Sequence, residues 1–473
     1  MKIGNIEKTF IGIIFVGIVL RLIFYSYDRP FWNDECALAL NLVDFNFLNC
    51  FKSLNYGQAA PPLFLIISET FTKFIPDIEL SLRFFPLISS ILSLFVFYDL
   101  SRRILNKKST ILFAFILFCF NYRLIYYAQE FKQYSSDVLI FISILASYFY
   151  LNIKNISTKR LTCFSIAYAI NIWLSFTSLF SIFTVLSVLL LKQFKEYKKT
   201  IALALPTLIS LGFFYISQHH LATSSFLHNY WAEGFISPNF SNILPLIFNY
   251  FSFSFNNLFL FLLFLIGIVL KLKEIKNEKS LILILPLILA MALSYFSVYP
   301  LSARVALYLI PIFILLSVQI LDYINIKNKL LKYFLYSVII FLGSFTVILN
   351  SMIIISLRKF EYEDIIFALN SAKQTMRAND ILYIPDGSKI SYEFYKKNFH
   401  FKNVMLEEKR ITDSKDYENF LNTLPKGRTY YYIFCHFPNK QERLNNIYLW
   451  AKEKKDFKIE VDKSLNAMVV FTQ

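Results

Sequence analysis

Residues 10–27 read FIGIIFVGIVLRLIFYSY, an apolar run long enough to enter a lipid bilayer. Directly after it comes DRPFWNDECALAL (28–40), in which Asp34 and Glu35 stand side by side among a proline and two aromatic residues. A solvated turn would explain the two acids but not the residues around them. No small-residue cleavage site follows the run, and Arg21 interrupts it, so we predict an uncleaved first membrane span rather than a signal peptide.

The composition of the whole chain is that of a membrane protein. Of 473 residues 56% are hydrophobic, including 53 Phe and 30 Tyr, and the mean hydropathy is +0.50. A soluble protein of this size could not bury so much apolar surface. The five cysteines show no metal-like spacing. Cys36 and Cys50 could share an external loop and pair, but we favour unpaired thiols.

From the number of apolar residues that a helix needs to cross a bilayer, we predict eleven membrane spans. They cover residues 9–27, 81–100, 109–125, 137–152, 161–175, 177–191, 200–217, 253–270, 281–298, 303–321 and 331–356. The fifth and sixth are short and nearly continuous, so one long helix or a buried hairpin is the alternative there.

The net charge of +16 is concentrated in loops on one side of this map. These loops are SRRILNKK (101–108), NIKNISTKR (152–160), KQFKEYKK (192–199), KLKEIKNEK (271–279) and DYINIKNKLLK (322–332). They carry 4, 3, 4, 4 and 3 Lys or Arg, whereas 218–240 on the opposite side carries none. By the positive-inside rule the N-terminus is cytoplasmic and the C-terminal part extracytoplasmic. The basic excess therefore orients the chain in the membrane and does not predict a nucleic-acid partner.

The last part of the chain changes character. Helix-like segments (EYEDIIFALNSAKQTM, ISYEFYKKN, ERLNNIYLWAKEKK) alternate with strand-like ones (DILYIP, RTYYYIF, KIEVD, AMVVFT). This alternation predicts a small α/β domain over 357–473, after a transmembrane module over 1–356 that includes the first outer loop, 28–79. The domain has no Gly-rich phosphate loop and no nucleophile elbow, so we expect no primary chemistry there.

The unusual charges lie at the outer ends of the predicted helices. They are Asp34, Glu35, Arg83, Glu130, Lys132, Asp137 and Arg304. A transporter or proton pump usually keeps such residues near the bilayer midplane. The arrangement here instead predicts a site at the outer membrane interface.

Some of these charges also have a structural interpretation. The segment 28–79 could form an amphipathic cap over the helix ends, with Asp34 or Glu35 as the N-cap of its first helix. Arg83 could snorkel to the interface, or it could bind a lipid phosphate.

The segment around residue 130 combines acids, a base and an amide. Glu130, Gln133, Tyr134 and Asp137 have the spacing of one helical face, and Lys132 points elsewhere on the same helix. An interfacial tyrosine belt explains part of this pattern, but not so dense a mixture of charges.

Five motifs in chain order resemble a known group of enzymes. They are WNDE (32–35), PPLFLI (61–66), LRFFPL (82–87), YYAQEFKQYSSD (126–137) and SARVALYLIP (302–311). Together they look like the bacterial GT-C glycosyltransferases related to protein O-mannosyltransferases and lipid A aminoarabinose transferases. The pattern covers roughly residues 10–150 well and the ninth and tenth spans loosely.

The resemblance implies a multi-pass enzyme of the bacterial inner membrane. Such an enzyme takes a hexosyl or pentosyl unit from a polyprenyl-phosphate donor at the outer, periplasmic face and inverts the anomeric carbon. The acceptor would be a lipid, a glycan or a protein, and membrane lipids surround the site. The sugar, the acceptor and the oligomeric state do not follow from the sequence.

Residue by residue, the resemblance makes Asp34 the catalytic base, with Glu35 supporting it or binding sugar or acceptor. Three cations would neutralise the donor phosphate, namely Arg83, Lys132 and Arg304. Three residues would contact sugar or acceptor, namely Trp32, Glu130 and Tyr134. Relatives often have Arg in place of Lys132, and Lys offers a point charge rather than a bidentate fork.

General chemistry supports these roles independently. A polyprenyl phosphate leaves readily only if fixed cations meet its developing charge, and an acceptor hydroxyl needs a carboxylate base.

No cofactor signature stands out in the sequence. The carboxylates form no recognisable metal cage, and His219, His220 and His228 lack ligand spacing. We therefore predict no metal site, although some GT-C enzymes use a divalent metal.

Two other classes remain open. One is a different lipid-linked glycan enzyme, such as an O-antigen polymerase or ligase, although these depend on a large loop late in the chain. The other is non-enzymatic, either a transporter or flippase of lipid-linked glycans or a relative that binds such a lipid without turnover.

Overall fold

The computed structural model describes residues 5–27, 29–43, 46–325, 327–357, 364–407, 414–435, 458–463 and 466–473. They form two compact units, which we treat separately. Unit 1 comprises residues 1–27, 46–53 and 59–355, and unit 2 comprises residues 28–45, 54–58 and 356–473. The first outer loop is therefore divided between the units.

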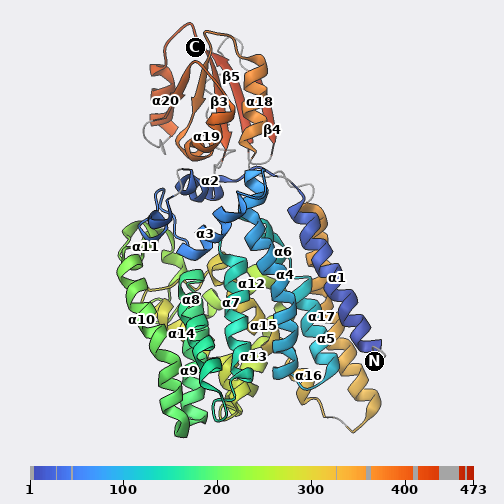
Figure 1. Cartoon of the computed structure of the whole chain (residues 1–473). Helices are drawn as coiled ribbons and strands as arrows, with labels where there is room; N and C mark the ends of the chain where they lie inside the picture. The colour runs from blue at the N-terminus through green and yellow to red at the C-terminus, as the bar shows by residue number, and fades with distance from the viewer. Residues whose placement is uncertain are drawn as a thin grey trace. The chain divides into compact units, whose positions relative to one another are not determined.

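Every predicted span coincides with a helix or a pair of helices of unit 1 (Figure 1). They are α1 (Asn5–Tyr25), α4 (Ile78–Ile104), α5 (Lys108–Cys119) with α6 (Tyr122–Tyr126), α7 (Tyr134–Ser147), α8 (Thr158–Leu174), α9 (Ser178–Lys192), α10 (Tyr197–Ala222), α13 (Leu258–Lys273), α14 (Glu278–Tyr295), α15 (Ile310–Val318) with α16 (Ile320–Tyr323), and α17 (Lys329–Leu357). The fifth and sixth spans are two separate helices, α8 and α9, because the chain breaks between them at 175–177.

Among the described residues six helices are long and apolar enough to cross a membrane, or seven if the pair α5 and α6, bent by 47°, forms one broken span. The shorter apolar helices are α3 (Pro62–Phe71), α7 extended to Tyr150, α9 and α12 (Ile243–Phe255). The sequence did not predict α12. The chain is a polytopic α-helical membrane protein.

The break between α5 and α6 is held by buried polar groups. Arg21 on α1 is fully buried, and its guanidinium donates to Ser90 Oγ (2.7 Å) and to the Gly17 and Cys119 carbonyls (2.9 and 3.3 Å). Asn121 Nδ2 donates to the Ser254 carbonyl at the end of α12 (2.9 Å). Irregular backbone at membrane depth is tolerated only when such partners satisfy it, so Arg21 belongs to the fold.

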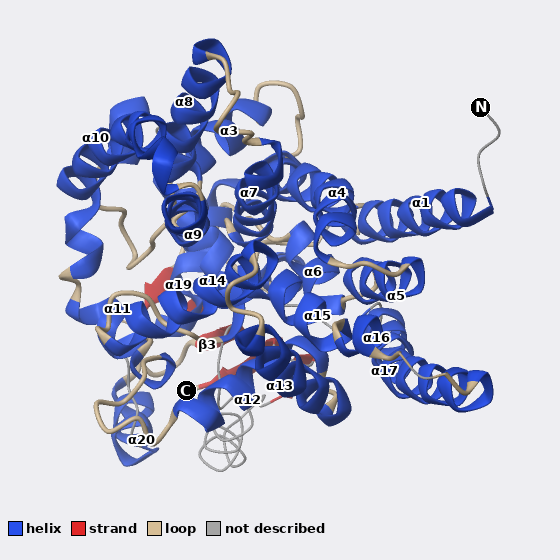
Figure 2. Cartoon of the chain, turned by 90° about the horizontal axis from the view of Figure 1, so that it is seen from below, coloured by secondary structure: helices blue, strands red, loops and turns tan. Residues whose placement is uncertain are grey.

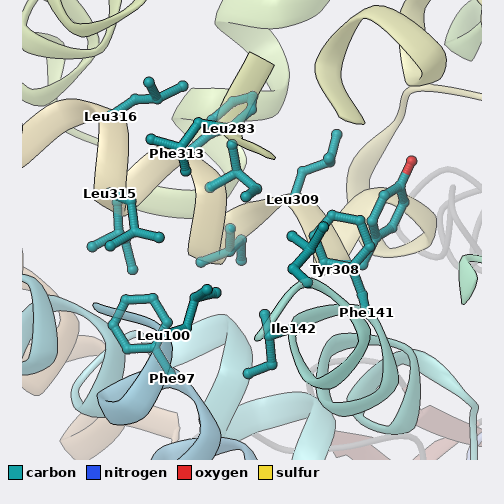
Figure 3. Packing of buried hydrophobic residues seen from close by; sticks show 14 of the residues in the cluster. Phe97, Leu100, Phe141, Ile142, Leu283, Tyr308, Leu309, Phe313, Leu315 and Leu316 are labelled. Carbon is teal, nitrogen blue, oxygen red and sulfur yellow. The ribbon is translucent and has the colours of Figure 1, made fainter. Parts of the chain in front are cut away.

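The core of unit 1 is a continuous apolar cluster around α15, whose residues are all buried. In Figure 3, Phe97 and Leu100 of α4 and Phe141 and Ile142 of α7 lie beside the α15 region, which supplies Tyr308, Leu309, Phe313, Leu315 and Leu316. Figure 2 shows the helices of this bundle from below, with α13 beside α15.

The close packing of α13 on α15 depends on Gly267. A Cβ atom there would overlap the Leu316 carbonyl oxygen and lie 2.7 Å from its carbon. We expect Gly267→Ala to lower the free energy of unfolding by about 1–3 kcal/mol, because the α15 backbone has to move. Thermal unfolding in detergent measures this. Gly212→Ala, on α10 with nothing within 4 Å, is the control, and equal melting temperatures would contradict the prediction.

Unit 2 contains a five-stranded sheet in the order β2-β1-β3-β5-β4. Its strands are β1 (Ile381–Ile384), β2 (Val404–Leu406), β3 (Thr429–Cys435), β4 (Lys458–Lys463) and β5 (Asn466–Thr472). The first three run parallel, and β5 is antiparallel to both β3 and β4. Its helices are α2 (Asn33–Ala39), α18 (Ile365–Thr375), α19 (Lys389–Tyr395) and α20 (Ser414–Thr423).

The sheet confirms the predicted α/β domain, although β2 was not predicted. Tyr383 on β1 pairs with Tyr432 on β3, and their rings stack at 4.6 Å within a buried cluster. The predicted helix over 442–455 lies outside the described residues.

Candidate active site

The predicted acidic pair lies on α2 in unit 2. The helix begins directly after Trp32, which is the N-cap with extended dihedral angles (φ −84°, ψ 173°). Glu35, at the third helical position, accepts a hydrogen bond from the Trp32 N–H at 3.4 Å. Neither acid is the N-cap, so that structural interpretation was wrong in detail, although Glu35 does stabilise the helix start.

Glu35 also forms a buried ion pair. Its Oε2 atom lies 3.1 Å from Nη1 of Arg29, and the two side chains are 0% and 4% exposed. A buried carboxylate is stable only with such partners. Asp34, the next residue along the helix, is only partly buried. The two acids therefore have different environments. Glu35 is buried in an ion pair that holds the loop, and Asp34 is the more accessible residue.

The segment that carries Glu130 and Lys132 belongs to unit 1. Glu130 has extended dihedral angles (φ −119°, ψ 130°), and α7 begins only at Tyr134. The predicted single helical face through Glu130 and Asp137 was therefore wrong. The physical reason is a tight turn, in which the Lys132 N–H donates to the Glu130 carbonyl at 2.7 Å.

A ring cluster ties this segment to the helix that carries Arg83. The Phe131 ring stacks on Phe64 of α3 at 5.7 Å, and Phe64 contacts Phe85 of α4 at 5.9 Å. Arg83 and Lys132 are 2% and 5% exposed. Because Arg83 is buried within the protein, its side chain does not extend along a lipid-facing surface. Its burial therefore disfavours the snorkelling interpretation.

Tyr134, another predicted residue, lies beside Tyr127. The centroids of the two rings are 5.2 Å apart. Arg304 lies on the 3₁₀ helix Ala303–Leu309 and is partly exposed.

Arg304 also contacts two aromatic residues at the end of helix α11 (Ser225–Tyr230). Its Nη2 donates to the Tyr230 hydroxyl at 3.4 Å, and its guanidinium carbon lies 5.9 Å from the Trp231 ring centroid.

The eight predicted site residues thus fall into two groups. Trp32, Asp34 and Glu35 lie together in unit 2, whereas the other five lie in unit 1. Sequence reasoning missed Arg29, although a base six residues before Glu35 was a usable signal. It also left Asp137 out of the site, although this carboxylate is buried and accepts a hydrogen bond from Ser175 Oγ at 2.5 Å.

In the part of the chain that is described, no three His, Cys, Asp or Glu side chains gather in a metal-binding arrangement. Cys36 and Cys50 are not joined by a disulfide. The Cys36 thiol instead donates to the Phe31 carbonyl at 3.5 Å.

Comparison with known proteins finds a likeness in structure alone. No protein-family model and no curated protein matches the chain. The crystal structure of ArnT from Cupriavidus metallidurans bound to undecaprenyl phosphate is similar with a TM-score of 0.54, covering 97% of each chain at 12% identity. The apo structure of ArnT from the same organism gives a TM-score of 0.52 at 11% identity over the same shares.

This likeness runs through both the transmembrane helices and the C-terminal domain, since it spans nearly the whole of each chain. It agrees with the fold that the five sequence motifs predicted. The chain therefore has the fold of ArnT.

Proposed function

We propose that the chain is an integral-membrane glycosyltransferase that moves a sugar from a polyprenyl-phosphate donor to an acceptor at the outer face of a bacterial inner membrane. The observation that carries the proposal is the full-length likeness to a structure of ArnT bound to undecaprenyl phosphate. The sequence motifs and the side-chain environments support it. The N-terminus is cytoplasmic and the C-terminal domain is periplasmic in this proposal.

The proposed reaction is a single displacement. The acceptor hydroxyl oxygen attacks the anomeric carbon, and the bond from that carbon to the donor phosphate oxygen breaks. The hydroxyl proton goes to a carboxylate, and the bonding electrons leave with polyprenyl phosphate. The configuration at the anomeric carbon inverts because one displacement occurs.

Asp34 is the proposed base. Asp34 is partly exposed as a residue, whereas Glu35 is fully buried in its ion pair with Arg29. A base has to reach the proton that it removes, and a fully buried, ion-paired acid is poorly suited to that task. We therefore assign Glu35 to holding the loop.

Arg83, Lys132 and Arg304 are the proposed ligands of the donor phosphate. Fixed cations stabilise the charge that develops on the leaving phosphate. Trp32, Glu130 and Tyr134 are proposed to contact the sugar or the acceptor.

The direct test is release of polyprenyl phosphate by the purified full chain. A panel of polyprenyl-phosphate hexoses and pentoses is incubated with bacterial membrane lipids, glycans and proteins as acceptors. We expect release from at least one donor, dependent on acceptor, and none with heat-inactivated protein. Absence of release throughout the panel would contradict the proposal.

Arg304→Ala tests the phosphate assignment. We expect the donor KM to rise about tenfold or more, because a charge-assisted contact to phosphate is lost, while kcat changes less. The matched control is Arg103→Ala, which removes an ion pair to Asp99 (3.0 Å) and a contact over the Tyr150 ring (4.0 Å) in the same unit. An equal KM for the two variants would remove Arg304 from the phosphate site.

A further inference from the structure

Helix α19 of the C-terminal domain packs directly on α2, the helix that bears Asp34. Both helices belong to unit 2, although 349 residues of sequence lie between the end of α2 and the start of α19. The reaction proposed above gives no role to this domain, so the contact needs its own explanation.

Three contacts join α19 to the residues around Asp34. The Phe31 N–H donates to the Tyr395 hydroxyl at 2.7 Å. The Phe31 ring lies 5.4 Å from that of Phe394. Ser391 Oγ donates to Asn33 Oδ1 at 3.2 Å. Together they hold the backbone immediately before the proposed base.

The hydrogen bond from Phe31 to Tyr395 is buried. Phe31, Ser391 and Tyr395 are 1%, 1% and 2% exposed. A buried hydrogen bond constrains geometry strongly, because breaking it leaves polar groups away from water.

Helix α2, which bears Asp34, is too short to be stable as an isolated helix. It has seven residues, and isolated helices much shorter than about 12–15 residues are marginal in water. Its geometry depends on packing, and within unit 2 that packing comes from α19 and from the Arg29–Glu35 pair.

We propose that α19 is a positioning element for the transfer reaction, with Tyr395 as the positioning residue that holds the Asp34 loop through the Phe31 amide. This rests on the proposed function of Asp34. The C-terminal domain then takes part in catalysis without touching the substrate, because a small displacement of a base is costly to the rate.

Tyr395→Phe tests the proposal, since it removes only the hydroxyl. We expect kcat to fall about ten- to hundredfold with an unchanged donor KM. Ser391→Ala leaves Tyr395 in place and should lower kcat about two- to tenfold. It provides a second variant in case the first folds poorly.

The matched control is Tyr430→Phe. Its hydroxyl donates to the Pro425 carbonyl at 3.0 Å within the same unit, so it also loses one hydrogen bond without touching the Asp34 loop. We expect near-normal kcat. Equal losses in Tyr395→Phe and Tyr430→Phe would overturn the proposal, because general destabilisation would explain both.

Two readouts separate this proposal from the proposed function. Amide hydrogen exchange over residues 31–39 should become faster in Tyr395→Phe but not in Tyr430→Phe, and unchanged exchange overturns the positioning role whatever the activity. Tyr395→Phe should cost nothing further in an Asp34→Asn background, since both changes act through the same base. If Asp34→Asn itself is fully active, the base assignment fails and the positioning role falls with it.

Discussion

Asp34→Asn is expected to lower the rate of polyprenyl phosphate release by about 10²- to 10⁴-fold, the range that a positioned general base contributes. Asparagine has nearly the same shape but cannot take the proton from the acceptor hydroxyl. The partly exposed position of Asp34 means that the change should leave folding intact. Donor binding should also remain, because the proposed phosphate ligands are unchanged.

The measurement is the initial rate at saturating donor and acceptor, with protein amounts matched after purification. Asp77→Asn is the control. Asp77 is the N-cap of α4 and accepts from the Leu80 N–H at 2.7 Å, and asparagine caps a helix equally well. We expect full activity there. Near-normal turnover by Asp34→Asn would show that another group removes the proton.

The membrane fold could be predicted well from the sequence, for a physical reason. In lipid every backbone polar group has to be satisfied within the segment, so long apolar runs become helices. Each of the eleven predicted spans falls on a helix or on two neighbouring helices, and six or seven of the described helices are long and apolar enough to cross a membrane. The bend between α5 and α6 was not predicted, because the run 109–125 is long and apolar enough to count as one span despite Asn121 and Arg123. Its stability comes from distant partners such as Arg21 and the Ser254 carbonyl.

The site could be predicted only in part. The order of motifs singled out Asp34 and Glu35 together, but adjacent acids look alike in sequence. What distinguishes them is that Glu35 is buried against Arg29, and hydropathy and spacing do not reveal which of two adjacent acids is the buried one. The contact of Phe31 with Tyr395 spans 364 residues, and no local pattern records such a pairing.

The segment at Glu130 shows a different limit. Helical spacing was present over 130–137, yet the chain forms a 3₁₀ helix over Tyr127–Gln129, an extended residue and a turn before α7 begins. Tertiary packing of Phe131 on Phe64 favours this irregular path over helical propensity.

Arg29→Met is the second large effect that we expect. It removes the guanidinium from a carboxylate that is fully buried, and breaking a buried ion pair in this way typically costs about 3–5 kcal/mol. Because the pair closes the loop around Asp34, we expect faster hydrogen exchange over residues 31–39 and a severe loss of turnover. Lys73→Met is the control, since its ion pair with Glu69 is longer (3.5 Å) and more exposed, and its loss should cost at most about 1 kcal/mol.

Glu35→Gln decides between a structural and a chemical role for Glu35. The glutamine carbonyl oxygen can still accept from Arg29 and from the Trp32 N–H, so we expect a much smaller effect than in Arg29→Met. In the double variant Arg29→Met/Glu35→Gln, most of the stability lost in Arg29→Met should return, because no buried negative charge is left. If instead Glu35→Gln is stable yet as inactive as Asp34→Asn, Glu35 takes part in proton transfer itself, and holding the loop is not its main role.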